Sequence, residues 1–520
     1  MPINNKGNNL YPRGSMWRKW DLQIHTPYSL VNYYKGANEN EKWEKFISDI
    51  ESLPPEFKVI GINDYLFIDG YKKVLEYKNR GWLENIELIL PVYECRIKKF
   101  AGHKEFRRIN FHVIFSNELS PQIIEQQFLN ALTAEYKLKT GLNGIDWSGS
   151  ITKDSLKNLG RKIKQSSPTG KEDRRVAEVD EGFNNLNLEE KIILDILRSN
   201  SFLKGKYLTA IGKAEWDQLS WNDQSIAEKK DIINKVNFVF ISSENIEKFN
   251  KAKEKLKEQN CNDLLLDCSD AHFNANSSNK DRIGKCFTWI KADPTFEGLK
   301  QILYEPEPGE RVSIGPAEPD NKNEYQVIQK IKFHNTNDFP EEIEFNQNLC
   351  SIIGSRSSGK SALLAYLAHS INPELAEKQN PKGPGDGFPW SKVDFSYSVE
   401  WNNRLSNEKS PGEIVYIPQN YLFEKSNDSD EVKKRIEPVL FKVIPDFEIK
   451  YKRVENDIST CNQKIAEQVE TWFELSELIR SLDEKLRRLG NKEVIEKEKK
   501  EIESKMGILR EKNQLSEEDV

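Results

Sequence analysis

Short apolar runs alternate with charged, helix-forming stretches over the first 315 residues of the chain. Seven runs have the length of buried strands: 19–26, 57–65, 87–96, 109–116, 207–212, 237–242 and 262–269. The stretches between them, such as 247–260, carry apolar residues at helical spacing among many charges. This order of strand, helix and strand predicts a parallel α/β sheet or barrel.

The pattern changes after residue 304. A passage rich in Pro, Gly and acidic residues at 305–323 predicts a linker. Beyond it, the apolar run 348–354 predicts a strand and 361–371 predicts a helix. Residues 378–390 have the composition of a loop, and 413–420 predicts another buried strand that ends in a polar turn.

A third pattern begins at Tyr451. Apolar or small residues recur up to Leu489 at steps that mostly alternate between three and four, with charges elsewhere, which predicts a long helix with a heptad seam. A buried bundle helix is the alternative, but the length and charge favour an exposed coiled-coil arm. Gly490 interrupts this periodicity.

These patterns divide the chain into four parts. We expect an α/β barrel over residues 1–315, with a helical insertion at about 117–235, and a linker at 316–323. A second lobe follows at 324–445, and a coiled-coil arm occupies 446–520.

Composition limits where such a protein works. Charged residues make up 31% of the chain, hydrophobic residues 37%, and the net charge is −6. We expect no membrane span because no run of 18 apolar residues occurs, and no secretory signal because the start lacks an apolar segment. The six cysteines have no paired spacing, which is typical of reduced thiols in a cytoplasmic protein.

One motif in the predicted lobe points to a nucleotide. Residues 354–361 read GSRSSGKS and match the phosphate-binding loop G-x-x-x-x-G-K-S/T. Glycines let backbone N–H groups turn towards phosphate oxygens, the lysine neutralises them, and the last hydroxyl coordinates Mg²⁺. The sequence therefore predicts that ATP and Mg²⁺ bind at Gly354, Ser355, Arg356, Ser357, Ser358, Gly359, Lys360 and Ser361.

The run IEFNQNLCSIIGSRSSGKSALL, followed by VYIPQ, resembles the first lobe of an ABC-type ATPase of the SMC and break-repair branch. This resemblance implies that Gln419 senses Mg²⁺ and the γ-phosphate; an ordinary turn glutamine is the alternative. It also implies a homodimer of ATPase heads. The signature, Walker B pair and switch histidine of that family do not follow the heptads. We therefore expect the chain to be the N-terminal part of a longer protein, or half of a split one, that does not hydrolyse ATP alone.

Acidic and histidine residues recur near the ends of the predicted strands. In α/β barrels the strand ends converge on one mouth, and clustered imidazoles and carboxylates there suit Zn²⁺, Mn²⁺ or Fe²⁺. Any one of these histidines alone would more often be structural, but the set predicts a metal site. Its candidate catalytic residues are His25, Asp64, Glu94, His112, Asp270 and His272.

The strings DLQIHTPYS, NDY, YE, FHV and SDAH resemble the motifs of the PHP (polymerase and histidinol phosphatase) family over about residues 16–315. Members are distorted seven-stranded (β/α) barrels that hydrolyse phosphoesters with up to three metals. The resemblance implies that His25, Glu94 and Asp270 hold one metal and that Glu94 bridges to a second at His112. His272 would belong to a third site, with Asp64 nearby.

Three departures from the PHP pattern change the expected metal count. Gln23 replaces the first histidine of H-x-H, Asn63-Asp64-Tyr65 replaces T-D-H, and no histidine occurs between residues 113 and 271. Gln23 and Asp64 remain additional candidate ligands. We expect one or two Mn²⁺, Zn²⁺ or Fe²⁺ ions, with the third site lost or remodelled.

The combination of both halves resembles the TrlF-type PHP–ATPases, bacterial proteins that resemble parts of phage-defence or nucleic-acid-processing systems. This resemblance implies an ATP-regulated phosphoesterase or nuclease acting on nucleic acid. An ATP-dependent nucleic-acid clamp or sensor with a degenerate barrel is the alternative, and a small-molecule phosphatase is a third. Residues 153–175, with eight Lys or Arg against three acids, are a candidate nucleic-acid groove, although such a run is more often a solvated insertion.

Overall fold

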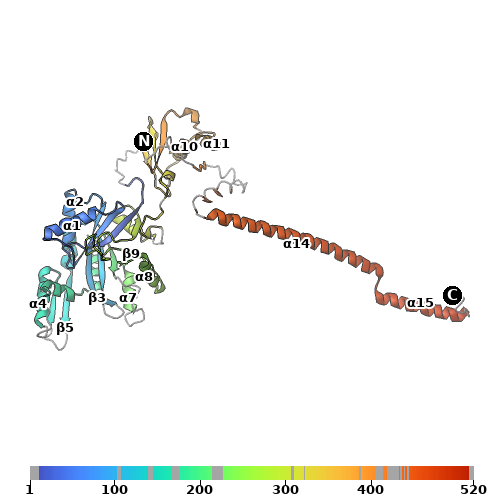
Figure 1. Cartoon of the computed structure of the whole chain (residues 1–520), viewed down its shortest axis with the longest axis horizontal. Helices are drawn as coiled ribbons and strands as arrows, with labels where there is room; N and C mark the ends of the chain where they lie inside the picture. The colour runs from blue at the N-terminus through green and yellow to red at the C-terminus, as the bar shows by residue number, and fades with distance from the viewer. Residues whose placement is uncertain are drawn as a thin grey trace. The chain divides into compact units, whose positions relative to one another are not determined.

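A computed structural model gives the structure of the chain. It describes residues 11–101, 107–138, 145–166, 175–212, 226–305, 310–320, 322–385, 388–403, 414–418 and 446–513, with a few single residues between 433 and 444. The chain forms two compact units (Figure 1). The first comprises 1–355 and 394–412, and the second comprises 356–393 and 413–520.

The first unit is built on a mixed sheet of nine strands in the order β11-β10-β1-β2-β3-β4-β7-β8-β9. Each of the seven predicted runs overlaps one of these strands, and the run 57–65 coincides with β2. The strands are β1 (Trp17–Ile24), β2 (Phe57–Tyr65), β3 (Leu88–Ala101), β4 (Arg107–Phe115), β7 (Tyr207–Gly212), β8 (Phe238–Ile241), β9 (Leu265–Asp267), β10 (Thr288–Lys291) and β11 (Val312–Ile314).

The sheet differs from the predicted seven-stranded parallel barrel in number and direction. β1, β2 and β3 are parallel neighbours, as are β7, β8 and β9. β4 runs antiparallel to both β3 and β7, and β10 runs antiparallel to both β1 and β11. A parallel bridge between Ile24 and Ala271 joins β1 to the segment after β9, so the sheet is nearly closed.

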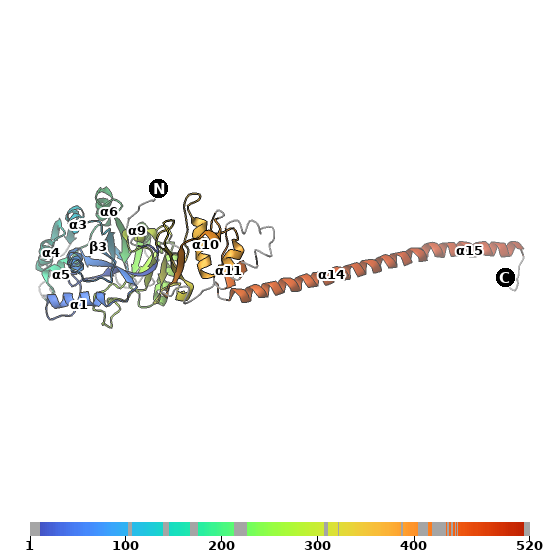
Figure 2. The same cartoon turned by 90° about the horizontal axis from the view of Figure 1, so that it is seen from above.

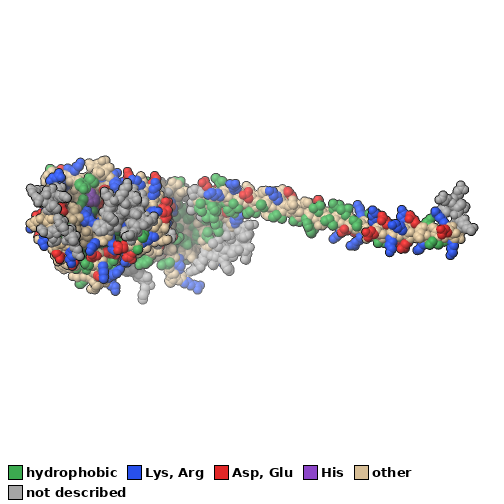
Figure 3. All heavy atoms as spheres, turned by 90° about the horizontal axis from the view of Figure 1, so that it is seen from below, with side chains coloured by type: hydrophobic (Ala, Val, Ile, Leu, Met, Phe, Trp, Pro, Cys, Tyr) green, Lys and Arg blue, Asp and Glu red, His purple; other side chains and the backbone are tan. Residues whose placement is uncertain are grey.

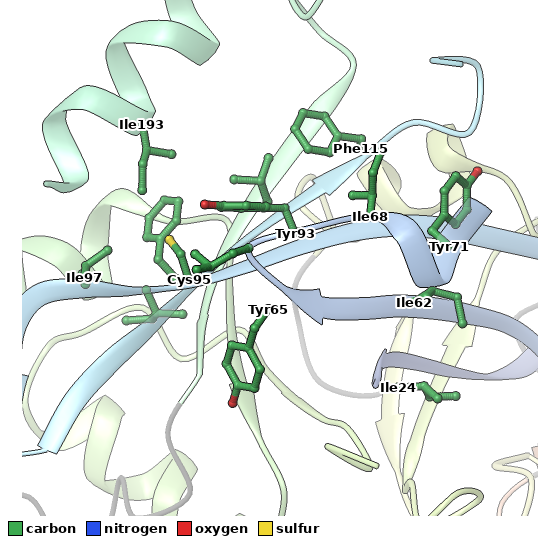
Figure 4. Packing of buried hydrophobic residues seen from close by; sticks show 14 of the residues in the cluster. Ile24, Ile62, Tyr65, Ile68, Tyr71, Tyr93, Cys95, Ile97, Phe115 and Ile193 are labelled. Atoms are coloured by element: carbon green, nitrogen blue, oxygen red, sulfur yellow. The ribbon is translucent and has the colours of Figure 1, made fainter. Parts of the chain in front are cut away.

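Hydrophobic residues fill both faces of this sheet. One cluster includes Leu88, Leu90 and Val92, which alternate along β3. A second cluster lies on the opposite face, between the sheet and its helices. Figure 4 shows part of this second cluster, in which Tyr93 of β3 and Ile193 of a covering helix lie on the same side of the strand. The first cluster therefore packs the interior, and the second attaches the helices.

Helices lie around the sheet (Figure 2). The helix α1 begins at a cap in which the Asn38 side chain accepts a hydrogen bond from the Glu41 N–H, and Asn245 caps α8 in the same way. The helices of this unit are α1 (Glu39–Glu51), α2 (Asp69–Asn79), α3 (Pro121–Gln127), α4 (Lys153–Ser166), α5 (Glu178–Asn185), α6 (Glu190–Ser199), α7 (Ile226–Lys235), α8 (Ile246–Glu258) and α9 (Phe296–Gln301), with the 3-10 turn η1 (Leu129–Ala131).

The predicted helical insertion at 117–235 is only partly helical. It contains α3 to α7, but also a separate hairpin of β5 (Thr133–Leu138) and β6 (Ile145–Ser150), and β7 of the main sheet. The basic stretch 153–175 forms α4, whose Leu156, Leu159 and Ile163 are buried. Its residues 167–174 lie outside the described part of the chain.

A small antiparallel sheet completes the first unit. It has the order β13-β12-β14, from β12 (Ile328–His334), β13 (Glu342–Glu344) and β14 (Ser396–Trp401), and is preceded by the 3-10 turn η3 (Glu324–Gln326). The passage predicted as a linker at 305–323 contains β11, because Val312 and its neighbours pair with β10. The described residues 316–320 form neither helix nor strand.

Two predicted strands near the phosphate-binding loop are wrong. Residues 348–354 form no strand, and Leu349 and Ile353 are 86% and 90% exposed. Of the second run, 413–420, the described residues 414–418 form no strand either, although Tyr416 is buried against Ala365 and Ala368. An apolar run becomes a strand only where another strand pairs with it, and neither run pairs within the described residues.

The predicted helix at 361–371 is confirmed as α10 (Lys360–Ile371). Asn372 then caps α11 (Pro373–Gln379), with Pro373 at its first position. The described residues of the predicted loop 378–390 that follow α11 form no helix or strand before the 3-10 turn η4 (Trp390–Lys392).

The heptad region is a helix of 43 residues, α14 (Phe447–Leu489), followed by α15 (Lys492–Asn513). Gly490 has a left-handed φ of +73°, which ends α14 where the periodicity predicted an interruption. Neither helix contains a buried residue. Apolar side chains such as Ile465, Trp472 and Ile479 are therefore exposed, and Figure 3 shows such side chains along α14.

Neither these helices nor any other in the described residues is long and apolar enough to cross a membrane. The cysteines are free thiols, as their spacing predicted. Cys95, Cys261, Cys268 and Cys286 are buried, while Cys350 and Cys461 are exposed.

Candidate metal centre

The interior faces of β3 and β4 change from apolar to polar along their length. Leu90 and Val92 are followed on the same face of β3 by Glu94, because side chains alternate along a strand. On β4, His112 lies on the same face as Ile114, two residues before it. Glu94 and His112 are register partners, and both are fully buried.

The closure of the sheet brings three more residues to this place. His25 follows β1, and Asp270 and His272 follow β9. The His25 N–H donates to the carbonyl of Ala271 at 3.0 Å, next to the bridge between Ile24 and Ala271. The structure therefore places five of the predicted residues together. We call them the acid–histidine group: His25, Glu94, His112, Asp270 and His272.

Three short distances connect this group. His25 Nε2 lies 3.3 Å from Asp270 Oδ1 and 3.4 Å from Glu94 Oε2, and His112 Nε2 lies 3.2 Å from the same Glu94 oxygen. Two ligands bonded at about 2.1 Å to one ion at tetrahedral or octahedral angles are about 3.0–3.4 Å apart. The spacing fits a shared ion, with Glu94 between two histidines.

His25, Asp270 and His272 offer ligand atoms that all lie within 4.8 Å of one another, so they could hold a metal ion. The ring centroids of the two histidines are 4.0 Å apart. Asp270 is only partly buried and has a left-handed φ of +48°, a conformation that aspartate adopts more readily than most residues. This side of the group is therefore its open side, while Glu94 and His112 lie deeper.

His112 is the histidine of the group with the fewest hydrogen bonds within the described residues. Nδ1 of this fully buried ring makes no hydrogen bond within the described residues, and Nε2 has only its 3.2 Å contact with Glu94. Buried imidazole nitrogens are normally partnered, and an unpartnered one costs free energy. Space for the ring depends on Gly212 of β7, where a Cβ would lie 2.7 Å from His112 Cε1.

The charges of the group balance one another in the metal-free protein. Burial lowers the pKa of His25, but hydrogen bonds and charges from Asp270 and Glu94 outweigh it and raise this pKa to about 10. Burial would raise the pKa of Glu94, but His112 and then His25 hold it well below its usual value. Burial and the charge of His25 lower the pKa of His272. A protonated His25 thus stands where a cation is favoured.

Four neutral side chains orient the ligand atoms. The Gln23 amide donates to Asp270 Oδ1 at 2.8 Å, and the Asn110 amide donates to Glu94 Oε1 at 2.6 Å. The Asn63 amide donates to the other Glu94 oxygen. Ser29 Oγ lies 3.1 Å from His25 Nδ1, which leaves Nε2 directed at the carboxylates. Such partners fix the orientation of metal ligands.

Asp64 and Gln23, the two additional candidate ligands, are engaged in hydrogen bonds. Asp64 accepts hydrogen bonds from the Thr26 N–H and hydroxyl, both at 2.8 Å, so each of its carboxylate oxygens has a hydrogen-bond donor outside the group. Burial raises the pKa of Asp64 to about 6. Gln23, a candidate ligand, uses its amide N–H to hold Asp270. Tyr65 stacks on His25 with ring centroids 4.8 Å apart.

Sequence reasoning missed Asn110 and treated Asn63 only as a departure. Both could have been found from the alternation of β-strands. Asn110 is two residues from His112 in NFHVIF, which places both side chains on one face. His112 was expected at the group because all strands were assumed to end at one mouth. Instead, β4 runs antiparallel to β3, and His112 reaches the group from the middle of β4.

The phosphate-binding loop has part of the expected local geometry. Ser357 and Gly359 have left-handed φ angles of +61° and +83°, and α10 begins at the next residue, Lys360. Residues 354–358 are exposed, and Lys360 Nζ lies 3.5 Å from Ser358 Oγ. Gln419, the predicted sensor of the γ-phosphate, lies outside the described residues.

Comparison of the chain with protein-family models and with curated proteins gave no match.

Proposed function

We propose that the barrel is a metal-dependent phosphoesterase acting on nucleic acid, and that ATP bound at residues 354–361 regulates it. The observation that carries the proposal is the convergence of His25 and His112 on one oxygen of Glu94, beside Asp270 and His272. Mixed imidazole and carboxylate ligands suit Zn²⁺, Mn²⁺ and Fe²⁺.

The residues divide into two ligand sets. His25, Asp270 and His272 would hold one ion, and Glu94 would connect it to a second ion at His112. Bound ions would polarise a phosphoryl oxygen and make water a stronger nucleophile at neutral pH. Gln23, Asn63 and Asn110 keep the carboxylates in place, and the buried walls at Glu94 and His112 exclude bulk water.

Two surface features favour nucleic acid as the substrate. Tyr33 is 56% exposed, and its ring stacks on Phe273 at 4.8 Å and lies 6.4 Å from His272. An exposed ring beside the open side of the group offers a face on which a base can stack. The exposed residues of α4 include Lys157 and Lys162, which suit phosphate contacts.

ATP binding is proposed from the loop alone. The N-terminus of α10 directly behind Gly359 provides N–H groups and a favourable dipole for phosphates. Homodimerisation of two such lobes, and a place in bacterial phage defence or nucleic-acid processing, are proposed from the resemblance to TrlF-type PHP–ATPases. In this proposal ATP controls access to the barrel, and the barrel performs the cleavage.

An ATP-dependent nucleic-acid clamp or sensor with a degenerate barrel is the second candidate. Two observations favour it: Gln23 and Tyr65 stand where the PHP pattern has histidines, and Asp64 is engaged by Thr26. This candidate predicts little bound metal and no effect of the acid–histidine group on nucleic-acid binding.

One experiment separates the two candidates. The purified chain is loaded with Mn²⁺, Zn²⁺ or Fe²⁺, its metal content is measured by elemental analysis, and cleavage of single-stranded DNA, RNA and bis(p-nitrophenyl) phosphate is followed. We expect one or two equivalents of metal and cleavage that His112→Ala abolishes. His334→Ala, which removes an exposed histidine of β12, is the matched control and should change neither. Absence of metal and of cleavage with all three ions would favour the clamp.

A further inference from the structure

Beyond Glu94 and His112, the interior faces of β3 and β4 carry two arginines. Arg96 is two residues after Glu94 on β3 and is the register partner of Asn110. Arg108 is two residues before Asn110 on β4. The interior row on β3 therefore runs from Val92 to Glu94 to Arg96, and both arginines follow the acid–histidine group outwards.

Contacts from the insertion hold the two side chains in place. The Arg96 guanidinium lies over the Phe183 ring, 4.2 Å from its centroid, and over the Tyr65 ring at 5.5 Å. It donates to Asn184 Oδ1 at 3.2 Å. Arg108 donates to the carbonyl of Leu186 and to Asn187 Oδ1, at 3.3 and 3.2 Å.

The segment that supplies these acceptors is itself attached to β3. The Leu188 N–H donates to the carbonyl of Arg96 at 3.0 Å, and the Lys98 N–H donates to the carbonyl of Leu188 at 2.9 Å. Two aromatic rings thus hold the Arg96 guanidinium, and hydrogen bonds to a segment that pairs with β3 hold that of Arg108. Held side chains lose less entropy when they bind a ligand.

Neither guanidinium forms an ion pair with a carboxylate of the described residues, although Glu94 is close in sequence. Their hydrogen-bond partners are a carbonyl and neutral amide oxygens. Burial and the charge of Arg96 lower the pKa of Arg108 to about 10, so Arg108 remains positive at neutral pH. The partly exposed guanidinium groups of Arg96 and Arg108 therefore lie beside the acid–histidine group without a carboxylate partner among the described residues.

We propose that Arg96 and Arg108 bind a phosphate next to the one that is hydrolysed, so that the site selects strands of nucleic acid over esters with a single phosphate. A guanidinium presents a planar set of donors that matches phosphate oxygens. The inference rests on the proposed phosphoesterase function and names the substrate class of the same site.

The spacing favours a strand over a nucleoside diphosphate. Arg96 is two residues from Glu94, which is about 6.6 Å along a strand. Phosphates of a nucleic-acid strand are separated by a sugar, whereas those of a diphosphate share one oxygen. A phosphate that reaches Arg96 while its neighbour lies at Glu94 therefore suits the strand.

The test compares substrates with one and several phosphates. Variants Arg96→Gln and Arg108→Gln are assayed for kcat/KM with Mn²⁺ on thymidylyl-thymidine, which has one phosphodiester, on octathymidylate and on ADP. We expect each variant to lose about 10- to 100-fold on octathymidylate, because charge-assisted hydrogen bonds to phosphate are lost, with little change on the dinucleotide. Arg96→Lys should recover part of the loss. Arg18→Gln is the matched control, because Arg18 lies at the start of β1, at the end of the strand opposite His25.

Binding distinguishes failure of the inference from failure of the proposed function. Anisotropy of fluorescein-labelled octathymidylate is measured in EDTA, where no cleavage occurs, alongside thermal unfolding of each variant. Weaker binding by both glutamine variants, with Arg18→Gln unchanged, supports the inference even if no variant cleaves. Equal binding by all variants, equal loss on both oligonucleotide substrates, or a selective loss on ADP would overturn it.

Discussion

The acid–histidine group and the phosphate-binding loop are both strong sequence patterns, but the structure builds them to different extents. His25, Glu94 and His112 are fully buried, and neighbouring amides hold the carboxylates in position. The loop has its left-handed positions and its helix, while the run before it is exposed up to 90% at Ile353. The loop and helix need only nearby residues, whereas the strand needs a partner strand.

This comparison shows which motifs form from local sequence alone and which require pairing with distant residues. A glycine-rich loop at a helix start is determined locally, because backbone φ preferences and helix propensity act over a few residues. A strand depends on pairing with residues far away in the sequence. The barrel provides that pairing for each of its strands, so its side chains converge.

The largest predicted effect concerns Glu94, at the centre of the acid–histidine group. Glu94→Gln removes the charge that faces His25 and His112, so bound metal and cleavage of bis(p-nitrophenyl) phosphate should fall, the latter about 1,000-fold. Elemental analysis and initial rates measure the two. Glu87→Gln, just before β3, is the control. Full activity in Glu94→Gln would contradict the ligand assignment.

A second prediction separates the two regions. Lys360→Ala should weaken ATP binding about 100-fold, because a charge-assisted contact with phosphate is lost. Metal content and cleavage of the small diester should not change, since all residues of the acid–histidine group belong to the first unit. Calorimetric titration with ATP measures the first effect. A loss of bound metal in this variant would break the separation.

A third prediction concerns the residue that departs from the PHP pattern. Gln23→Leu removes the amide that orients Asp270, so the Mn²⁺ dissociation constant should rise at least about tenfold. Gln329→Leu, on β12 outside the barrel group, controls for loss of a glutamine. Unchanged affinity would show that Gln23 is not needed for orientation.

The pH dependence of metal binding gives a fourth prediction. The pKa of His25 is raised from 6.5 to about 10, so its protonation stabilises the metal-free fold below pH 6.5, and this contribution is lost as pH rises through 10. A metal must displace that proton. Mn²⁺ affinity should therefore rise about tenfold per pH unit between 7 and 9, with about one proton released. Calorimetry in buffers of different ionisation enthalpy counts the protons, and a flat profile would refute the prediction.

The smallest effect tests the exposed run before the loop. Ile353→Ala should change the free energy of unfolding by less than about 0.5 kcal/mol, because the side chain is 90% exposed. Ile62→Ala, in β2 and 1% exposed, should cost about 2–5 kcal/mol. Urea unfolding measures both. Equal losses would mean that residues 348–354 are packed in solution.

Much of the barrel could be predicted from the sequence because its strands are short apolar runs with helices between them. The runs 57–65 and 207–212 coincide with β2 and β7. The antiparallel direction of β4 could not be predicted, because an apolar run carries no information about its orientation. β10 was missed because only two of the four residues of TWIK are apolar, so it does not form an apolar run.

The acid–histidine group was predictable for a different reason. His25, Glu94 and Asp270 carry chemistry that an apolar core does not need, so their positions are visible in the sequence. Which atoms meet could not be predicted, because the bridge between Ile24 and Ala271 joins residues more than 240 positions apart. Asp64 illustrates the limit, since its residue type suits a ligand but Thr26 engages it.

The central claim is that one barrel holds a metal between His25, Asp270 and their neighbours. The most direct measurement is an anomalous-scattering difference map from crystals grown with Mn²⁺ or Zn²⁺. We predict a peak about 2.0–2.2 Å from His25 Nε2 and an Asp270 oxygen, with any second peak beside His112 and Glu94. A map from metal-saturated crystals with no peak at these atoms would contradict the claim.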